Sequence, residues 1–265
     1  MNNVKRNALF IIDPQNDFCD QRGSLYVDGA AADMLRLARH IERHASAYTD
    51  VMVSLDSHDV SAIFHPRFWQ DENGAHPEPF TAITPDEYAA GKWRAVSHEN
   101  EFYADRLFRV FARKNIGSLM IWPEHCIVST WGHQIADSVR DALRSWRDVS
   151  GRAVRFFFKG ENPYTEQFSV FEGVDDSWGD TAFNENLFGY LAGCESITFS
   201  GEALSHCVDA SITSYLNRRR LHGACAEQEQ TIYLLRDCTS PVSGERAQYE
   251  DRLASSGVRL IQSVF

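Results

Sequence analysis

The segment Ser196–Val208, SITFSGEALSHCV, contains a short apolar run, a turn and a cysteine. Ser196–Ser200 predicts a buried β-strand, and Asp209–Leu216 predicts the start of a helix, so Cys207 lies where a strand gives way to a helix. The positive field of a helix N-terminus lowers the pKa of a thiol, which favours a nucleophilic cysteine. The alternative is a small buried apolar residue without chemistry. The rest of the chain decides between the two.

Outward from this segment, apolar runs alternate with amphipathic runs. The expected strands are Ala8–Asp13, Val51–Asp56, Arg152–Lys159, Ser196–Ser200, Thr231–Arg236 and an edge strand at Val258–Val264. The expected helices are Ala30–Ala45, Asp86–Trp93, Phe102–Phe111, Gly132–Trp146, the helix after Cys207 and Glu245–Ala254. Strands that alternate with helices predict a three-layer α/β/α domain with a mostly parallel central sheet.

Residues 67–119 do not follow this alternation. They are rich in Trp, Phe, His and charged residues, and they are too many for an ordinary connection. We expect one domain over residues 1–265. Residues 67–119 are then an insertion that caps the carboxyl edge of the sheet or contacts another subunit of a homo-oligomer.

The composition excludes several classes of partner. The 265 residues carry a net charge of −11, which argues against nucleic acid or an anionic membrane as a partner. The apolar runs are too short to span a membrane, and the first residues show no cleavable signal pattern. The six cysteines form no C-x-x-C pair, which is typical of reduced thiols in the cytoplasm.

Four polar residues follow the ends of four expected strands: Asp13, Asp56, Lys159 and Cys207. In parallel sheets, ligands bind beyond these carboxyl ends. A buried Asp13 could take the thiol proton, and Lys159 would favour the ionised thiolate. Cys207 could then attack an amide carbonyl to give a thioester, while the N–H groups of Ala203 and Cys207 bind the oxyanion.

A second group of residues suggests a metal site. In Asp56-x-His58, two side chains point the same way from an extended segment, and His65 and His125 follow across loops. One carboxylate and three imidazoles suit one divalent ion of Zn, Fe or Mn, with positions left for water or substrate. Ordinary surface histidines are the alternative.

Five motifs occur in a characteristic order. They are IIDPQNDF (11–18), LDSHDVSAIFHP (55–66), WPEHC (122–126), the Lys159-Gly160 pair and GEALSHCV (201–208). In this order they resemble the isochorismatase-like cysteine hydrolases, and among these the metal-dependent nicotinamidases. The resemblance implies the isochorismatase-like fold and a hydrolase of linear amide bonds. The implied reaction converts nicotinamide to nicotinate and ammonia, a step of NAD salvage in pyridine nucleotide biosynthesis.

The resemblance also implies roles for individual residues. The implied catalytic triad is Asp13, Lys159 and Cys207, and the implied metal ligands are Asp56, His58, His65 and His125. A cis peptide bond is implied between Glu202 and Ala203, with the Ala203 N–H in the oxyanion hole. The substrate's ring nitrogen would bind the metal. The expected substrate-binding residues are Phe18, Trp122, Phe168 and His206, with the ring stacked between Phe18 and Trp122.

Two segments depart from the compact members of this family. Residues 160–166 are longer and more acidic, and the insertion at 67–119 is much longer. Both border the expected pocket, so other substrates stay open: another heteroaromatic carboxamide, or a carbamoyl or ureido amide. A non-catalytic metal-binding scaffold is an alternative of another class. Hydrolysis of the vinyl ether of isochorismate is a third, although that branch lacks the metal ligands.

Overall fold

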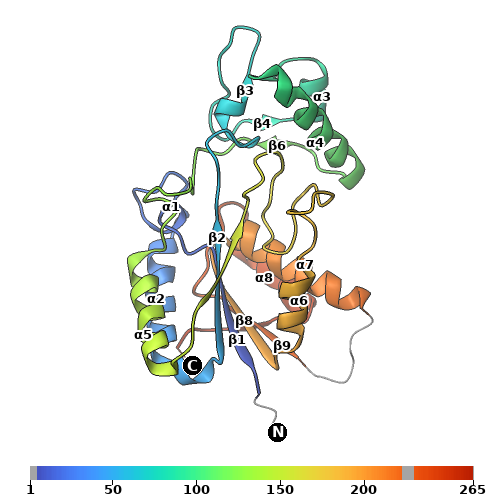
Figure 1. Ribbon diagram of the computed structural model, residues 1–265. Helices are drawn as coiled ribbons and strands as arrows, with labels where there is room; N and C mark the ends of the chain where they lie inside the picture. Colours follow the sequence, from blue (N-terminus) through green and yellow to red (C-terminus); the bar gives the residue numbers. More distant parts are fainter. Residues whose placement is uncertain (1–4, 223–229, 265) are drawn as a thin grey trace.

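The computed structural model of the chain describes residues 5–222 and 230–264. Its central sheet has six strands, all parallel, in the order β10-β9-β8-β1-β2-β7 (Figure 1). The strands are β1 (Asn7–Ile12), β2 (Asp50–Asp56), β7 (Arg155–Lys159), β8 (Ser196–Gly201), β9 (Thr231–Leu235) and β10 (Arg259–Ile261). The expected parallel sheet and its six strands are confirmed.

Strand β1 explains why the sheet is buried on both faces. Its side chains alternate between two hydrophobic clusters: Leu9 and Ile11 belong to one, while Ala8, Phe10 and Ile12 belong to the other. Successive side chains of a strand point to opposite faces, so a strand that is apolar throughout needs a cover on both sides.

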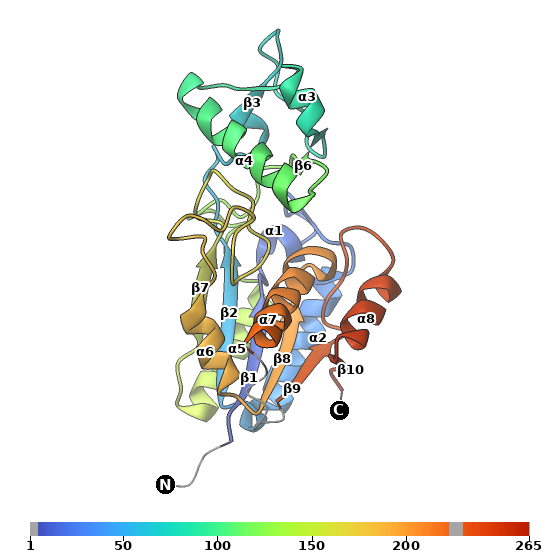
Figure 2. The same cartoon turned by 90° about the vertical axis from the view of Figure 1, so that its right-hand side faces the viewer.

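Helices supply this cover in two layers. Helices α2 (Ala30–Arg43) and α5 (Asp137–Ser150) lie on one face of the sheet. The other face carries α6 (Glu185–Ala192), α7 (Asp209–Leu221) and α8 (Arg246–Ser255), as Figures 1 and 2 show from two directions. The chain therefore has the expected α/β/α architecture.

The order of the strands fixes where a ligand site can form. From β1 the chain adds β2 and then β7 on one side; it returns to place β8 beside β1, and adds β9 and β10 beyond it. The strand order thus reverses between β1 and β8. In parallel α/β sheets, ligands bind beyond the carboxyl ends of the strands at such a switch point.

The insertion at 67–119 lies beyond the carboxyl ends of the strands in both views (Figures 1 and 2). The elements of this region begin one residue before the insertion and end one residue after it. They are η2 (Pro66–Phe68), β3 (Trp69–Gln70), β4 (Ala82–Ile83), α3 (Pro85–Ala89), β5 (Arg94–Ala95), η3 (His98–Asn100), α4 (Glu101–Lys114) and β6 (Leu119–Met120). Its buried Trp69 and Phe108 belong to the same hydrophobic cluster as α2 and α5. This position suits a cap over the sheet edge, which stays a prediction.

The helix predicted over Gly132–Trp146 starts later than expected: α5 begins only at Asp137. Residues 132–135 instead pair with the segment that follows β1. The backbone N–H groups of Asn16 and Asp17 donate to the carbonyls of Gln134 and Gly132. The amphipathic pattern does run on into this segment, but its backbone polar groups are used to hold the turn after β1.

Other boundaries shift by a few residues. The strand expected from Arg152 starts at Arg155, where pairing with β2 begins, and the helix expected over Asp86–Trp93 ends at Ala89. The five cysteines within the described residues are free; Cys225 lies outside them. No helix among the described residues is long and apolar enough to cross a membrane.

Candidate active site

The four polar residues predicted at the strand ends meet at the carboxyl edge of the sheet. The Nζ atom of Lys159 lies 3.0 Å from Asp13 Oδ2 and 2.8 Å from Asp56 Oδ1. It also lies 3.5 Å from the Sγ atom of Cys207. All four side chains are buried. The structure therefore places the expected triad around one lysine, at the switch point between β1 and β8.

Asp13 follows β1 directly and is held in a fixed orientation. Its φ of 43° lies in the left-handed region, and the Ser54 hydroxyl donates to its Oδ1 at 2.6 Å. Burial raises the pKa of Asp13, while the charge of Lys159 opposes this shift. A carboxylate with a raised pKa is a stronger base, as the role of a proton acceptor requires.

Cys207 lies in a π-helical turn, Leu204–Val208, that leads directly into α7. Burial raises the pKa of the Cys207 thiol well above its usual value, although Lys159 acts in the opposite direction. The net shift is therefore upward, not the downward shift expected from a helix N-terminus, because desolvation is its largest cause. This direction favours the protonated thiol, and a carboxylate oxygen of Asp13 lies within 4.8 Å of Cys207 Sγ, where it can serve as the base that removes the proton.

The turn before Cys207 is anchored on both sides. The expected cis peptide bond between Glu202 and Ala203 is confirmed. The Glu202 N–H donates to the carbonyl of Ile12 at 2.8 Å, and the Glu202 carboxylate accepts from the Ser240 N–H at 2.9 Å. Gly201 has a φ of +107°, and a Cβ there would lie 1.9 Å from the Ile12 oxygen, so only glycine fits. The turn is thereby fixed against the end of β1.

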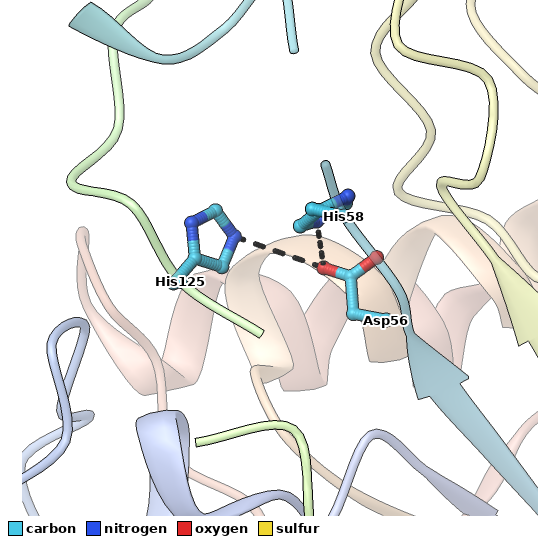
Figure 3. Close-up of side chains that lie close together, drawn as sticks. All are labelled: Asp56, His58 and His125. Atoms are coloured by element: carbon cyan, nitrogen blue, oxygen red, sulfur yellow. Dashed lines mark ion pairs between the residues drawn. The ribbon is translucent and has the colours of Figure 1, made fainter. Parts of the chain in front are cut away.

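The predicted metal ligands gather beside the triad (Figure 3). The Oδ2 atom of Asp56 lies 2.9 Å from His58 Nε2 and 3.8 Å from His125 Nε2. Each of these three residues offers a ligand atom within 4.8 Å of the others. His65 adjoins them: its ring centroid lies 5.8 Å from that of His58 and 5.4 Å from that of His125. The structure thus brings three expected ligands together and the fourth next to them.

The hydrogen bonds of the three imidazoles fit a metal ion. In each ring Nδ1 pairs with a backbone carbonyl, which leaves Nε2 as the nitrogen that would face a metal ion. The pairs are His58 with Gly160 at 3.1 Å, His65 with Asp59 at 3.1 Å and His125 with Pro123 at 2.8 Å. Within the described residues, the buried Nε2 of His65 has no hydrogen-bond partner, and burial lowers the pKa of this imidazole to about 4. One carboxylate and three imidazoles are the donor set of a divalent metal site.

Gly160 explains the Lys159-Gly160 pair of the sequence. Its carbonyl accepts the proton of His58 Nδ1, and a Cβ at this position would lie 2.4 Å from the His58 ring. A larger residue would displace the imidazole, so the glycine allows the backbone to approach it.

The expected substrate-binding residues line a narrow chamber of about 30 Å³ that ends at Cys207. The ring centroid of His206 lies 5.3 Å from that of Trp122 and 5.4 Å from that of Phe168. Phe18 lines the same chamber, with its ring centroid 5.5 Å from that of His125. All four side chains therefore lie around the space in front of the thiol.

Sequence reasoning missed two polar residues of the site, Ser54 and Glu166. Ser54 stands two residues before Asp56 on β2, so the period of two residues could have placed it on the same face. Glu166 is 6% exposed, lines the chamber and accepts a hydrogen bond from Trp122 Nε1 at 3.1 Å. Burial raises its pKa to about 7. Its segment is acidic, but no spacing singles out this carboxylate.

Comparison with known proteins reveals a consistent group of similar structures. No protein-family profile matches the chain. A nicotinamidase of Saccharomyces cerevisiae is 22% identical over 238 residues, which cover 90% of this chain and 89% of the yeast protein. The solved structure of the yeast nicotinamidase superposes with a TM-score of 0.65 at 19% identity, covering 96% of this chain and 99% of that one.

Two further solved structures are similar. A nicotinamidase/pyrazinamidase of Acinetobacter baumanii gives a TM-score of 0.64 at 19% identity, with 98% of this chain and 97% of that one covered. A pyrazinamidase of Pyrococcus horikoshii, solved in complex with zinc, gives a TM-score of 0.54 at 18% identity. This match covers 97% of this chain and 99% of that one. The chain has the isochorismatase-like α/β fold of the nicotinamidase and pyrazinamidase structures.

Proposed function

We propose that this chain is a metal-dependent amidase that hydrolyses nicotinamide to nicotinate and ammonia. The observation that carries the proposal is the convergence of Asp13, Lys159 and Cys207 at one buried point, with Lys159 Nζ 3.0 Å from the carboxylate and 3.5 Å from the sulfur. The similarity in sequence and fold to nicotinamidases supports the choice of substrate.

The first half of the proposed reaction forms a thioester. Asp13 takes the proton of Cys207 as Sγ bonds to the amide carbon, and the N–H groups of Ala203 and Cys207 bind the oxygen that becomes negative. Lys159 stabilises the ionised pair during this step. The C–N bond then breaks, and Asp13 returns its proton to the departing nitrogen, which leaves as ammonia.

The second half removes the acyl group. Asp13 takes a proton from a water molecule whose oxygen attacks the thioester carbon, and the C–S bond breaks. Asp13 returns its proton to Cys207, and the acyl group leaves as nicotinic acid, which loses its proton to solvent and becomes nicotinate. A divalent ion held by Asp56, His58, His65 and His125 would supply a Lewis acid for the pyridine nitrogen and so orient the ring. Phe18 and Trp122 would flank that ring.

Ammonia release tests the proposal. The wild-type protein is assayed with nicotinamide, benzamide and a carbamoyl amide, with and without a chelator, beside Cys207→Ala. We expect turnover of nicotinamide that is lost in Cys207→Ala, and slow turnover of benzamide because it lacks the ring nitrogen. Metal binding without turnover of any amide would favour the non-catalytic scaffold instead. Turnover that prefers the carbamoyl amide would move the substrate to that class.

A further inference from the structure

A second cavity adjoins the catalytic chamber on the side of the insertion. Its volume is about 560 Å³, against about 30 Å³ for the chamber in front of Cys207. The two cavities share the walls formed by Trp122, Glu166, Phe168 and His206. A volume of this size is typical of pockets that bind small molecules. We call this cavity the outer chamber.

The outer chamber is lined mainly by apolar side chains of the insertion and the segment after it. Phe80, Phe111, Ile116, Leu119 and Met120 contribute to its wall. Such a surface gains free energy by releasing water when an apolar group covers it. Nicotinamide has no group that would reach these side chains while its carboxamide lies at Cys207, so the outer chamber fits a larger molecule.

Glu166 is the buried carboxylate on the boundary between the two chambers. Its Oε2 accepts from Trp122 Nε1 at 3.1 Å, and its Oε1 accepts from the Gln167 N–H at 3.2 Å. Each carboxylate oxygen has a second lone pair, so each can accept one further hydrogen bond. A carboxylate between two mainly apolar cavities therefore favours a ligand that brings a donor to this boundary.

We propose that the outer chamber is a substrate subsite for an apolar group attached to the ring of a pyridine carboxamide through an N–H linker. The carboxamide reaches Cys207, the linker donates to Glu166, and the apolar group covers the side chains of the insertion. The inference rests on the proposed function for the identity of the carboxamide. It gives residues 67–119 a role in selecting the substrate.

Binding to the Cys207→Ala protein tests the subsite without depending on turnover. Calorimetry compares nicotinamide with its phenylamino and phenoxy derivatives at ring positions 5 and 6, which differ only in an N–H or an O linker. In buffer at pH 8, where Glu166 is ionised, we expect one phenylamino compound to bind at least tenfold more tightly than nicotinamide and than its phenoxy partner, since only the N–H linker can donate to the carboxylate. Equal affinity for the linker pair at both positions would overturn the proposal.

A variant that fills the outer chamber provides the second test. Ser118 lines that chamber and not the catalytic one, so Ser118→Trp should weaken phenylamino binding at least tenfold and change nicotinamide binding less than threefold. Ser145→Trp, on the exposed surface of α5, is the matched control. If Ser118→Trp does not fold, Ile116→Trp fills the same chamber. An equal effect on both ligands, or none, would contradict the subsite.

Turnover by the wild-type protein separates this inference from the proposed function. Hydrolysis of nicotinamide together with weak binding of every substituted amide would overturn the subsite and leave the proposed function intact. Tight binding and hydrolysis of a phenylamino compound without hydrolysis of nicotinamide would support the subsite and overturn nicotinamide as the substrate.

Discussion

At the scale of single residues, Asp56 connects the two halves of the candidate site. Its Oδ1 pairs with Lys159 at 2.8 Å, and its Oδ2 lies 2.9 Å from His58 Nε2. One carboxylate therefore touches both the lysine of the triad and the histidines of the metal site. A metal ion bound by Asp56 would therefore change the charge around Lys159.

The imidazoles should differ in their importance for metal binding. His58 lies within 4.8 Å of the other donors, whereas His65 stands further off. We expect His58→Ala to raise the Kd for zinc by at least about 100-fold, more than the loss of an outer hydrogen-bond partner would cost. His65→Ala should raise it less. Elemental analysis and a competition assay measure both, with the exposed His98→Ala as control. Equal metal content in all three variants would refute the ligand set.

Glu166 should position Trp122 rather than take part in the chemistry. Glu166→Leu removes the acceptor for Trp122 Nε1, whereas Glu166→Gln keeps an oxygen there. Since a hydrogen bond contributes roughly 0.5–1.5 kcal/mol net, we expect KM for nicotinamide to rise about threefold to tenfold in the leucine variant, with a smaller change in kcat. The glutamine variant should restore KM in large part. A loss confined to kcat would speak against this role.

At the scale of elements, the segments that carry the site are better predicted than their boundaries. The ends of β1, β2, β7 and β8 follow from apolar runs that stop at Asp13, Asp56, Lys159 and the turn before Cys207. Each strand ends where the side chains become polar, and that change is visible in the sequence. The start of α5 could not be predicted from the sequence. The backbone of residues 132–135 forms hydrogen bonds with the segment after β1, which is distant in sequence.

His40 connects α2 with the segment after β10 and makes stability depend on pH. Its Nδ1 donates to the Ser263 carbonyl at 2.8 Å, and its Nε2 accepts from the Tyr48 hydroxyl at 2.7 Å, so the fold holds a neutral imidazole. Burial lowers the pKa of His40; the hydrogen bond with Ser263 and the charge of Asp237 raise it by less, and Arg43 acts in the same direction as burial.

The unfolded chain therefore binds a proton at His40 before the folded protein does. Stability rises with pH when the unfolded state binds more protons, so this contribution is present above about pH 6.5 and is lost as the pH falls below it. Thermal unfolding between pH 8 and pH 5 should reveal a decrease in Tm that is smaller in His40→Gln. The exposed His98→Gln serves as control. Identical pH profiles for wild type and His40→Gln would contradict this account.

At the scale of the whole molecule, the fold brings together residues that are far apart in sequence. Asp13 and Cys207 meet because the strand order reverses between β1 and β8. The chemistry of the pair could be inferred from the sequence, but the raised pKa of Cys207 and the outer chamber could not. Both depend on which side chains exclude water around the site, and the sequence pattern does not encode that.

Removal of the metal should destabilise the whole fold. A ligand at 100 times its Kd stabilises the folded state by about 2.7 kcal/mol, and each 1 kcal/mol shifts the Tm of a chain of roughly this size by about 2–4 °C. We therefore expect chelation to lower the Tm by about 5–10 °C and added zinc to restore it. Calorimetry with metal content checked by elemental analysis measures this. An unchanged Tm after complete removal would argue against the metal site.

The central claim is that Cys207 forms a covalent thioester with the acyl group of nicotinamide. The most direct measurement is mass spectrometry of the wild-type protein quenched in acid during turnover, followed by peptide mapping. We predict a mass increase of one nicotinoyl group on Cys207 in the wild type, and neither adduct nor ammonia release in Cys207→Ala. Ammonia release from nicotinamide that persists in Cys207→Ala would contradict the account.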